Sequence, residues 1–445
     1  MKKSILLLAA GSLAVLLAAA TPAALRADEY ALEDLYRIAL ARSEKLKVVE
    51  ENLTISEIGT DRARSYLLPR VTASGGLTQY SQKKYSATGS VVQPESNSSW
   101  GVQVAETVSL SGRELTALGI SKQGVTRSRY DLSAVREDYL LKFVASAYYD
   151  VLMARKNLEI AEANLDRLQK YREAAEKRLR IGEVTKTALL RAEGELSGAK
   201  SDRLQAGNDL DLALAVLASN VGLRDTTLTL KEEPVARGEL PGIAVFQEQA
   251  FTLRPDLKSL EVQKKIAADV IKYAEGAFWP SVTVAGGYTG ADQYPASATF
   301  NRESIYGGVA LNFPLFEGGL RKADVAEAKA RERQAALFYE DARKGIEIEV
   351  RSAYLDLMTQ KGVLQFQNDQ MAFARENYLA VSRQFDFGLS SSLDVLDANT
   401  LLVSAERRAA SADYNFRLAL LRMKKATGTL LATVMPPQEA APSTR

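Results

Sequence analysis

An internal repeat constrains the fold of this chain more than any other feature, because the sequence is written twice. In a first block, Pro69 and Gly75-Gly76 are matched by Pro280 and Gly286-Gly287. In a second block, at a slightly different spacing, the matches are Gly112 with Gly318, Ala147-Tyr148 with Ala353-Tyr354, Gly182 with Gly388, and Gly222 with Gly428. The spacing changes only between the two blocks, which predicts a longer surface loop in the first copy.

Each copy contains the same order of predicted elements. A shorter helical region, about residues 44–67 or 256–278, ends at a proline and leads into a strand rich in Val, Thr and Gly. A polar loop and a second strand complete a β-hairpin in each copy. We therefore divide the chain into a first structural repeat at 28–222 with its hairpin at about 71–110, a linker at 223–242, a second repeat at 243–433 with its hairpin at about 281–315, and a disordered tail at 434–445.

A very long helix is predicted after each hairpin, from near Gly112 to Arg180 and from near Gly318 to Asp386. A helix of about 69 residues spans on the order of 100 Å. Apolar residues recur along it at alternating steps of four and three, a period of 3.5 that indicates a coiled-coil seam. In the first copy this seam comprises Leu140, Val144, Ala147, Val151, Ala154, Leu158, Ala161, Leu165, Leu168, Ala175 and Leu179. Each long helix then turns at a glycine into a returning helix, which gives two antiparallel helical hairpins.

The first segment, residues 1–27, has the pattern of a secretory signal peptide. Lys2 and Lys3 precede an apolar run from Ile5 to Ala20, and we expect cleavage after Ala27. The apolar run is slightly long, so an uncleaved anchor is the alternative. The rest of the chain contains no apolar stretch near 18 residues, so an exported chain of this kind is either soluble in the periplasm or a membrane β-barrel. Four strands cannot close a membrane barrel and an open edge is not viable in lipid, so the second case requires an oligomer.

The composition excludes most catalytic chemistry, because the chain contains no cysteine and no histidine. Disulfides, thiolate nucleophiles, thiolate zinc sites and the usual general base are all absent. A formal net charge of +2 argues against nucleic acid as a partner. We therefore expect no enzyme, no catalytic residue, no bound metal and no cofactor.

Several motifs, taken in their order and duplication, carry a family resemblance. They are Arg254-Pro255-Asp256-Leu257, the Pro-x-Val-Thr strand starts, the run Phe313-Pro314-Leu315-Phe316-Glu317-Gly318-Gly319, and Phe387-Gly388 followed by Asp394-Val395-Leu396-Asp397-Ala398. Over residues 28–431 the chain resembles the TolC-type outer membrane efflux proteins, also called outer membrane factors. The resemblance implies an α+β membrane protein, a homotrimer whose chains jointly complete a transmembrane β-barrel and a long α-helical barrel.

The resemblance also implies a function. The trimer would lie in the cell outer membrane, contact its lipid and span into the periplasm. There it would meet a periplasmic adaptor protein and, through it, an inner-membrane pump, as the exit duct of a tripartite efflux pump or a type I secretion system. A soluble periplasmic coiled-coil scaffold or adaptor is the alternative, although it leaves the four strands unexplained.

In this family the turn from the long helix to the returning helix is the periplasmic entrance, so the resemblance implies a gate there. The acidic residues of the expected constriction are Asp394 and Asp397, and the family's other gate positions are occupied here by Ser390, Phe385 and Thr187. Those three residues cannot form the family's best-known ion-pair lock, so we expect a different or weaker one. The acids are equally explained by the start of a helix, where Ser391 would be the cap, and the two interpretations are compatible.

The sequence also suggests roles for residues at the tip, for basic residues of the long helices and for aromatic residues of the strands. The adaptor is expected to contact the tip at Gly182, Glu183, Val184, Gly388 and Leu389. Basic residues of the long helices, among them Arg172 and Arg178, are interpreted as solvated helix faces. Trp100 and Tyr306 are candidates for an aromatic girdle, and Trp279 for the point where helix meets strand at the membrane surface.

Overall fold

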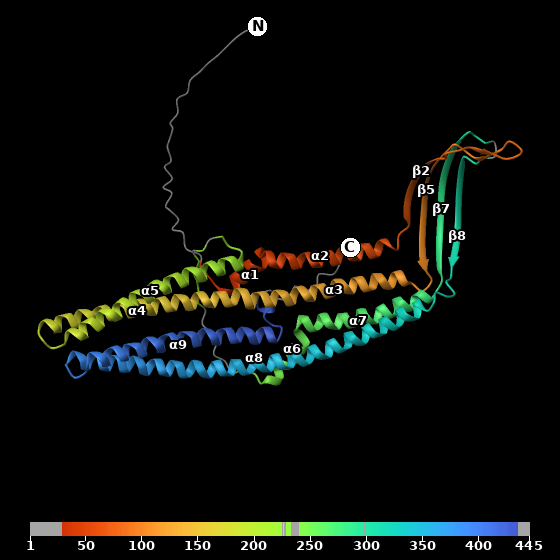
Figure 1. Ribbon diagram of the computed structural model, residues 1–445. Helices are drawn as coiled ribbons and strands as arrows, with labels where there is room; N and C mark the ends of the chain where they lie inside the picture. Colours follow the sequence, from red (N-terminus) through yellow and green to blue (C-terminus); the bar gives the residue numbers. More distant parts are fainter. Residues whose placement is uncertain (1–28, 225, 227, 233–239, 298–299, 435–445) are drawn as a thin grey trace, which may run out of the picture.

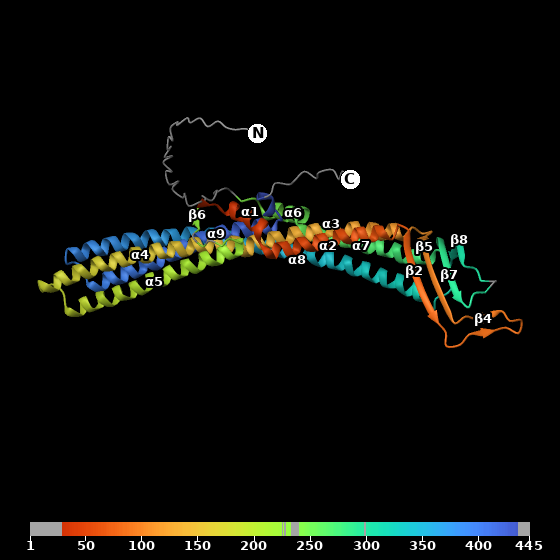
Figure 2. The same cartoon turned by 90° about the horizontal axis from the view of Figure 1, so that it is seen from above.

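The molecule is an elongated bundle of helices with a small β-sheet at one end (Figures 1 and 2). This computed structural model describes residues 29–224, 226, 228–232, 240–297 and 300–434. The expected signal peptide at 1–27 lies outside the described residues. The strands form one end of the rod, and the turns of the two helical hairpins form the other (Figure 1).

The helices of the two copies follow the same order, but the long helix is divided in two in the first copy and continuous in the second. In the first copy they are α1 (Leu32–Arg42), α2 (Glu44–Ser65), α3 (Arg113–Tyr139), α4 (Ser146–Arg180) and α5 (Lys186–Val221). In the second copy they are α6 (Ile243–Leu253), α7 (Pro255–Glu275), α8 (Leu320–Asp386) and α9 (Ser392–Ala426). The short helices α1 and α6 at the start of each repeat were not predicted from the sequence.

The predicted seam is confirmed by burial along the long helices. In the first copy Leu140, Val144, Val151 and Leu168 are all less than 9% exposed, and Val350 and Leu357 are equally buried in the second copy. The first long helix is interrupted by a π-helical segment, η1 (Leu140–Ala145), whereas α8 runs without a break for 67 residues. The π segment lies inside the main hydrophobic core, which also contains α1 residues such as Leu35 and Tyr36.

The sheet contains both hairpins. Its strands are β2 (Arg70–Gln79), β5 (Ser96–Ser109), β7 (Ser281–Tyr294) and β8 (Glu303–Asn312), and each pairs antiparallel with its neighbour in the order β2-β5-β7-β8. The pairing of β5 with β7 therefore joins the two copies, and β2 and β8 are the open edges within one chain. Both inner strands are longer than predicted, and the first loop contains a small extra hairpin of β3 (Lys84–Tyr85) and β4 (Val91–Gln93).

The two faces of the sheet differ sharply in polarity. Residues paired across antiparallel strands share a face, so the register assigns every side chain to one of two sides. One face, called the apolar face below, carries Val71, Leu77, Trp100, Val102, Val104, Val108, Val282, Val284, Tyr288, Ile305, Val309 and Leu311. The opposite, polar face carries mainly Thr, Ser, Gly, Ala and Gln; there the hydroxyls of Thr107 and Thr283 lie 2.9 Å apart.

This assignment bears on the expected aromatic girdle. Trp100 lies on the apolar face and is 48% exposed, so its place in a girdle stays a prediction. Tyr306 pairs with Gly287 and lies on the polar face, so its assignment to a girdle was wrong. Successive side chains of a strand point to opposite sides of the sheet, so Ile305 lies on the apolar face and the next residue, Tyr306, lies on the polar face.

Parts of the expected linker and tail are packed rather than free. Within the linker, β6 (Thr229–Leu230) pairs parallel with β1 (Glu29–Tyr30), and Leu230 is buried in the main core. The carboxylate of Glu232 lies 2.9 Å from the guanidinium of Arg417 on α9. The expected disordered tail at 434–445 begins too early, because Val434 is only 4% exposed and packs in the same core; the rest of that tail is outside the described residues. Within the described part of the chain, no helix combines the length and the apolar character needed to cross a membrane.

Candidate gate at the helical tip

The tip of the first hairpin is the turn between α4 and α5. Gly182 adopts a left-handed backbone with φ of 82°, and its N–H donates to the carbonyl of Leu179 at 3.1 Å. A glycine is favoured at such a position because other residues are strained there. Thr185 caps α5 by accepting a hydrogen bond from the N–H of Ala188 at 3.3 Å. Glu183 and Thr187 are exposed and Val184 is half-buried, so this turn presents a mixed surface.

The tip of the second hairpin, between α8 and α9, has the same design. Gly388 has φ of 73°, and the N–H of Leu389 donates to the carbonyl of Gln384 at 2.8 Å. The side chain of Leu389 is 79% exposed. Together the two turns place the five expected adaptor-contact residues at the end of the rod.

Asp394 is engaged in capping α9. Its Oδ2 accepts hydrogen bonds from the Ser391 hydroxyl at 2.7 Å, the Ser391 N–H at 2.8 Å and the Ser390 hydroxyl at 3.3 Å. In return the hydroxyl of Ser391 accepts from the N–H of Asp394 at 3.3 Å, which completes a capping box. The hydrogen bonds from Ser391 hold the pKa of the Asp394 carboxyl below its usual range. Asp394 is therefore ionised at neutral pH.

Asp397 lies one turn further along α9 and is exposed, as is Asp394. Between and beside them Val395, Leu396 and Ala398 are buried against the neighbouring helices. Residues three apart share a helix face, so the two carboxylates lie together on the outward side of the helix start. Thr187, on the other turn, makes no side-chain hydrogen bond within the described residues.

Phe385 has a different place from the one expected. Its side chain is only 5% exposed, and its ring centroid lies 5.6 Å from that of Tyr171 on α4. Tyr171 in turn donates a hydrogen bond to the Ser392 carbonyl at 3.1 Å. Phe385 is thus part of a small core between the two hairpins, so it packs the tip and does not line an opening. Phe385 differs from the expected gate position because its large apolar ring is buried against Tyr171 of α4.

Arg178 is the tip residue that sequence reasoning missed. Its guanidinium donates to the carbonyl of Phe385 at 2.7 Å and to that of Asp386 at 3.0 Å, the last carbonyls of α8. It also stacks on the Phe385 ring at 4.2 Å and lies within 4.0 Å of the carboxylates of Asp386 and Glu183. The interpretation of Arg178 as a solvated residue was wrong, because a cation at the C-terminal end of α8 satisfies free carbonyls and complements the helix dipole. The sequence did contain one signal for this: Arg178 follows Tyr171 by seven residues, and residues seven apart lie on the same face of a helix.

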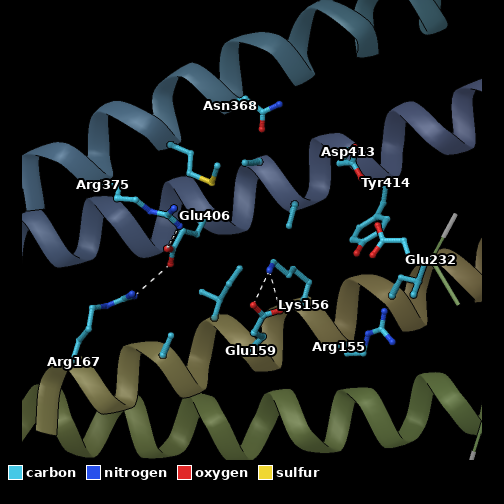
Figure 3. A pocket seen from close by; sticks show the side chains of 16 residues that line it. Arg155, Lys156, Glu159, Arg167, Glu232, Asn368, Arg375, Glu406, Asp413 and Tyr414 are labelled. Atoms are coloured by element: carbon cyan, nitrogen blue, oxygen red, sulfur yellow. Dashed lines mark hydrogen bonds and ion pairs between the residues drawn. The ribbon is translucent and has the colours of Figure 1, made fainter. Parts of the chain in front are cut away.

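A second set of polar contacts joins the hairpins about five turns from the tip. Asn399 donates to the Oδ1 atom of Asn164 at 2.8 Å, and both side chains are buried. Arg167 donates to Asn399 at 3.0 Å and pairs with Glu406 at 3.4 Å, while Arg375 approaches the other oxygen of Glu406 at 3.5 Å. Figure 3 shows Glu406 between the two arginines, at one end of a groove of about 600 Å³ between α4 and the α8–α9 hairpin. These contacts, all within one chain, join the two hairpins.

Among the described residues no group of three or more Asp and Glu side chains is placed to hold a metal ion. Glu137 is a buried acid outside the tip, and burial raises the pKa of its carboxyl to about 7. It lies in the main core near Lys425 and Arg254, far from the tip.

Comparison with known proteins decides the family. The model described as outer membrane efflux protein matches residues 35–223 and 247–429, one segment in each repeat. The chain belongs to the outer membrane efflux protein family. It is therefore a transport channel of the outer membrane that extends into the periplasm, and the family is not known for catalysis.

Individual relatives are distant but nearly full-length. The chain is 24% identical to the outer membrane protein TolC of Vibrio cholerae over 90% of this chain and 91% of that protein. It is 23% identical to the outer membrane efflux protein BepC of Brucella suis over 87% of this chain and 81% of that protein. Its structure is similar to the CmeC outer membrane channel of Campylobacter jejuni, with a TM-score of 0.75, 18% identity and coverage of 90% of this chain and 86% of that one.

Proposed function

We propose that three copies of the chain form one continuous tube, the exit duct of an efflux or secretion assembly. One observation carries the proposal: a single chain joins a two-faced sheet with open edges to helical hairpins of great length. The 67 residues of α8 reach on the order of 100 Å. Edge strands β2 and β8 have no partner on their outer sides in one chain, so pairing β8 of one copy with β2 of the next would close the sheet.

The polarity of the sheet supports the same assembly. Its apolar face exposes Ile305, Val309 and Leu311 by 66% or more, an arrangement that is stable in lipid and costly in water. The polar face would then line a water-filled interior. A soluble periplasmic scaffold, the alternative function, would have no use for this face and would be released from membranes without detergent.

The tip turns are the proposed contact for a periplasmic adaptor protein and, through it, an inner-membrane pump. Gly182, Glu183, Val184, Gly388 and Leu389 lie at the end of the rod furthest from the sheet. Leu389 and Ile181 are 79% and 69% exposed there, which offers an apolar contact from each hairpin. A partner docking end-on would meet both turns of every chain.

The acidic residues of α9 are the proposed constriction. Three copies would bring Asp394 and Asp397 around one axis, and such a ring attracts cations. Asp394 is already held by Ser390 and Ser391, so we assign the larger part of ion selection to Asp397, which has no capping role. Phe385 and Arg178 hold the two hairpins together behind this ring, and they are the lock that replaces the missing family ion pair.

The test is ion conductance of the purified protein in planar bilayers. Asp397→Asn should reduce cation selectivity, whereas Asp394→Asn keeps an oxygen acceptor for the cap and should have a smaller effect. Glu195→Gln, an exposed acid on α5, is the control. If Asp397→Asn forms channels with unchanged selectivity, the proposed acidic constriction is wrong but the proposed duct still stands. Absence of channels from a correctly folded oligomer would overturn the duct itself.

A further inference from the structure

A carboxylate lies among valines on the apolar face of the sheet, whereas the other two acids of this face, Asp292 and Glu303, lie towards the loop ends of β7 and β8. Glu106 on β5 pairs with Val284 on β7, which in turn pairs with Val309 on β8. Its neighbours on the same face of β5 are Val104 and Val108, two residues away on either side. The register of β5 with β7 is continuous from end to end, so no bulge moves Glu106 to the polar face.

Glu106 lacks a partner in the part of the chain that the structure describes. Within the described residues it accepts no hydrogen bond and forms no ion pair. The nearest cation by register, Arg70, pairs with Ala105 and therefore lies on the polar face. Because β5 lies inside the sheet, Glu106 is also not at the proposed seam between copies, so an adjoining copy would not cover it.

The position of Glu106 along the strand places it near a membrane surface. Glu106 lies three residue steps before Ser109, the end of β5, which is a distance of about 10 Å. Exposed aromatic residues surround the junction of strands and helices, namely Trp279 at 61%, Phe313 at 49% and Phe316 at 86%. Such residues mark the interface of a membrane. Glu106 therefore lies close to that level, about 10 Å along the strand.

A shallow notch lies beside Glu106 on the same face. Its floor is formed by Gly286 and Gly307, which pair with each other. They belong to the next row of residues on this face, two residues along each strand from Val284 and Val309. A Cβ atom at Gly307 would meet no atom within 4 Å, so the surface is open there. Its walls are the paired Val284 and Val309 on one side and the paired Tyr288 and Ile305 on the other. The notch is apolar throughout, with a carboxylate at its corner.

The geometry points to a binding site for a phospholipid whose headgroup carries a primary amine, in the leaflet on the helical side. The acyl chain would lie in the Gly286–Gly307 notch, and the ammonium group would donate hydrogen bonds to the Glu106 carboxylate. An unpaired carboxylate on a lipid-facing surface is costly and selects a cationic partner. A primary ammonium has three donors, whereas the quaternary ammonium of a choline headgroup has none. The site requires that the sheet lies in the outer membrane, but it does not depend on the gate.

Native mass spectrometry of the purified, delipidated oligomer tests this site. The probes are phosphatidylethanolamine, phosphatidylcholine and phosphatidylglycerol with identical acyl chains. We expect the unmodified protein to retain phosphatidylethanolamine roughly tenfold better than the other two, the effect of one charge-assisted contact. Glu106→Gln should abolish this preference. Glu303→Gln should preserve the preference, because Glu303 lies on the same face but at the far end of the sheet, at the start of β8.

Two further results make the outcome decisive. Glu106→Lys should reverse the preference towards phosphatidylglycerol, because the sign of the charge is inverted. Equal retention of all three lipids by the unmodified protein, or an unchanged preference in Glu106→Gln, would overturn the site. A basic membrane protein that co-purifies only when Glu106 is present, without any lipid preference, would also overturn it. Channel conductance of Glu106→Gln should be normal, so failure of this site and failure of the proposed duct are separable.

Discussion

The side-chain amide of Asn399 donates a 2.8 Å hydrogen bond to the side-chain oxygen of Asn164, and this buried pair joins the two helical hairpins of one chain. Arg167 donates to the side-chain oxygen of Asn399 at 3.0 Å. The neighbouring seam residues Ala161, Leu165 and Leu168 are apolar, so a polar pair here fixes which residues of α4 face which residues of α9.

Removing one member of the pair should destabilise the hairpins. In Asn164→Ala the amide of Asn399 loses its acceptor in a buried place, and we expect a loss of about 1–3 kcal/mol in the free energy of unfolding. Thermal unfolding of Asn164→Ala, Asn399→Ala and the double variant measures the coupling between the two residues. Additive losses would show that the pair contributes nothing specific.

Arg178 should control how tightly the tip is held. Arg178→Ala removes the two hydrogen bonds to the last carbonyls of α8, so we expect faster amide hydrogen exchange around Leu389 and about 1–2 kcal/mol less local stability. Arg178→Lys should recover part of the protection, because a single ammonium can still reach one carbonyl. Arg180→Ala is the matched control, since Arg180 is 70% exposed and pairs only with Glu176. Equal effects of the two alanine variants would contradict the assigned role.

Gly290 should not tolerate a larger residue. Gly290 faces Trp100 across the β5–β7 pair, and a Cβ atom built on it would lie 2.4 Å from the indole ring. We expect Gly290→Ala to cost about 1–3 kcal/mol and to lower the yield of assembled oligomer, as judged by heat-resistant migration on gels. Gly308→Ala serves as the control, because nothing lies within 4 Å of a Cβ atom there. Restoration of assembly by Trp100→Leu in the Gly290→Ala background would identify the clash as the cause.

The stability of the main core should depend on pH through Glu137. Burial raises the pKa of its carboxyl to about 7, whereas it is near the ordinary value of 4.5 when unfolded. Between these values the folded state binds the extra proton, so stability should fall as the pH rises from about 4.5 to 7 and stay low above it. Glu137 accepts a hydrogen bond from the Leu431 N–H at 3.3 Å, which glutamine can also accept.

Glu137→Gln should therefore remove this pH dependence and stabilise the protein at pH 8 by up to about 3 kcal/mol. Urea unfolding at pH 5 and pH 8 measures the difference. Lys425 and Arg254 lower the pKa, while Asp256 raises it, so the midpoint should move if any of these three is neutralised. Glu347→Gln, at an exposed position on α8, should leave the pH profile unchanged.

The larger features of this fold follow from patterns that the sequence displays directly. The tandem order of elements and the 3.5-residue seam predicted the four long helices of the hairpins, because burial of a regular stripe determines where a helix packs. The π-helical segment at Leu140–Ala145 was not predictable, since its residues continue the same apolar stripe. The pairing of Leu230 with Tyr30 was also missed, because a two-residue strand carries no periodicity.

The candidate gate shows the same division. Ser391 and Asp394 could be assigned as a helix cap from their spacing alone, and the structure contains that cap. The roles of Phe385 and Arg178 depend on which helix lies opposite them, and this information is not present in either helix alone. Sequence reasoning therefore placed its candidate residues at the two turns, but it did not foresee that Phe385 is buried and that Arg178 binds the end of α8.

The pairing of β5 with β7 has a consequence for assembly. Because the two hairpins belong to one polypeptide, the seam between them forms at the high effective concentration that a tether provides, without waiting for a second molecule. Only the seams between β8 and β2 then depend on protein concentration, so half of the ring's joints are made before any encounter takes place. The covalent duplication also allows the two turns to differ in sequence, so a ring of such chains alternates two kinds of turn, one containing Glu183 and the other Leu389.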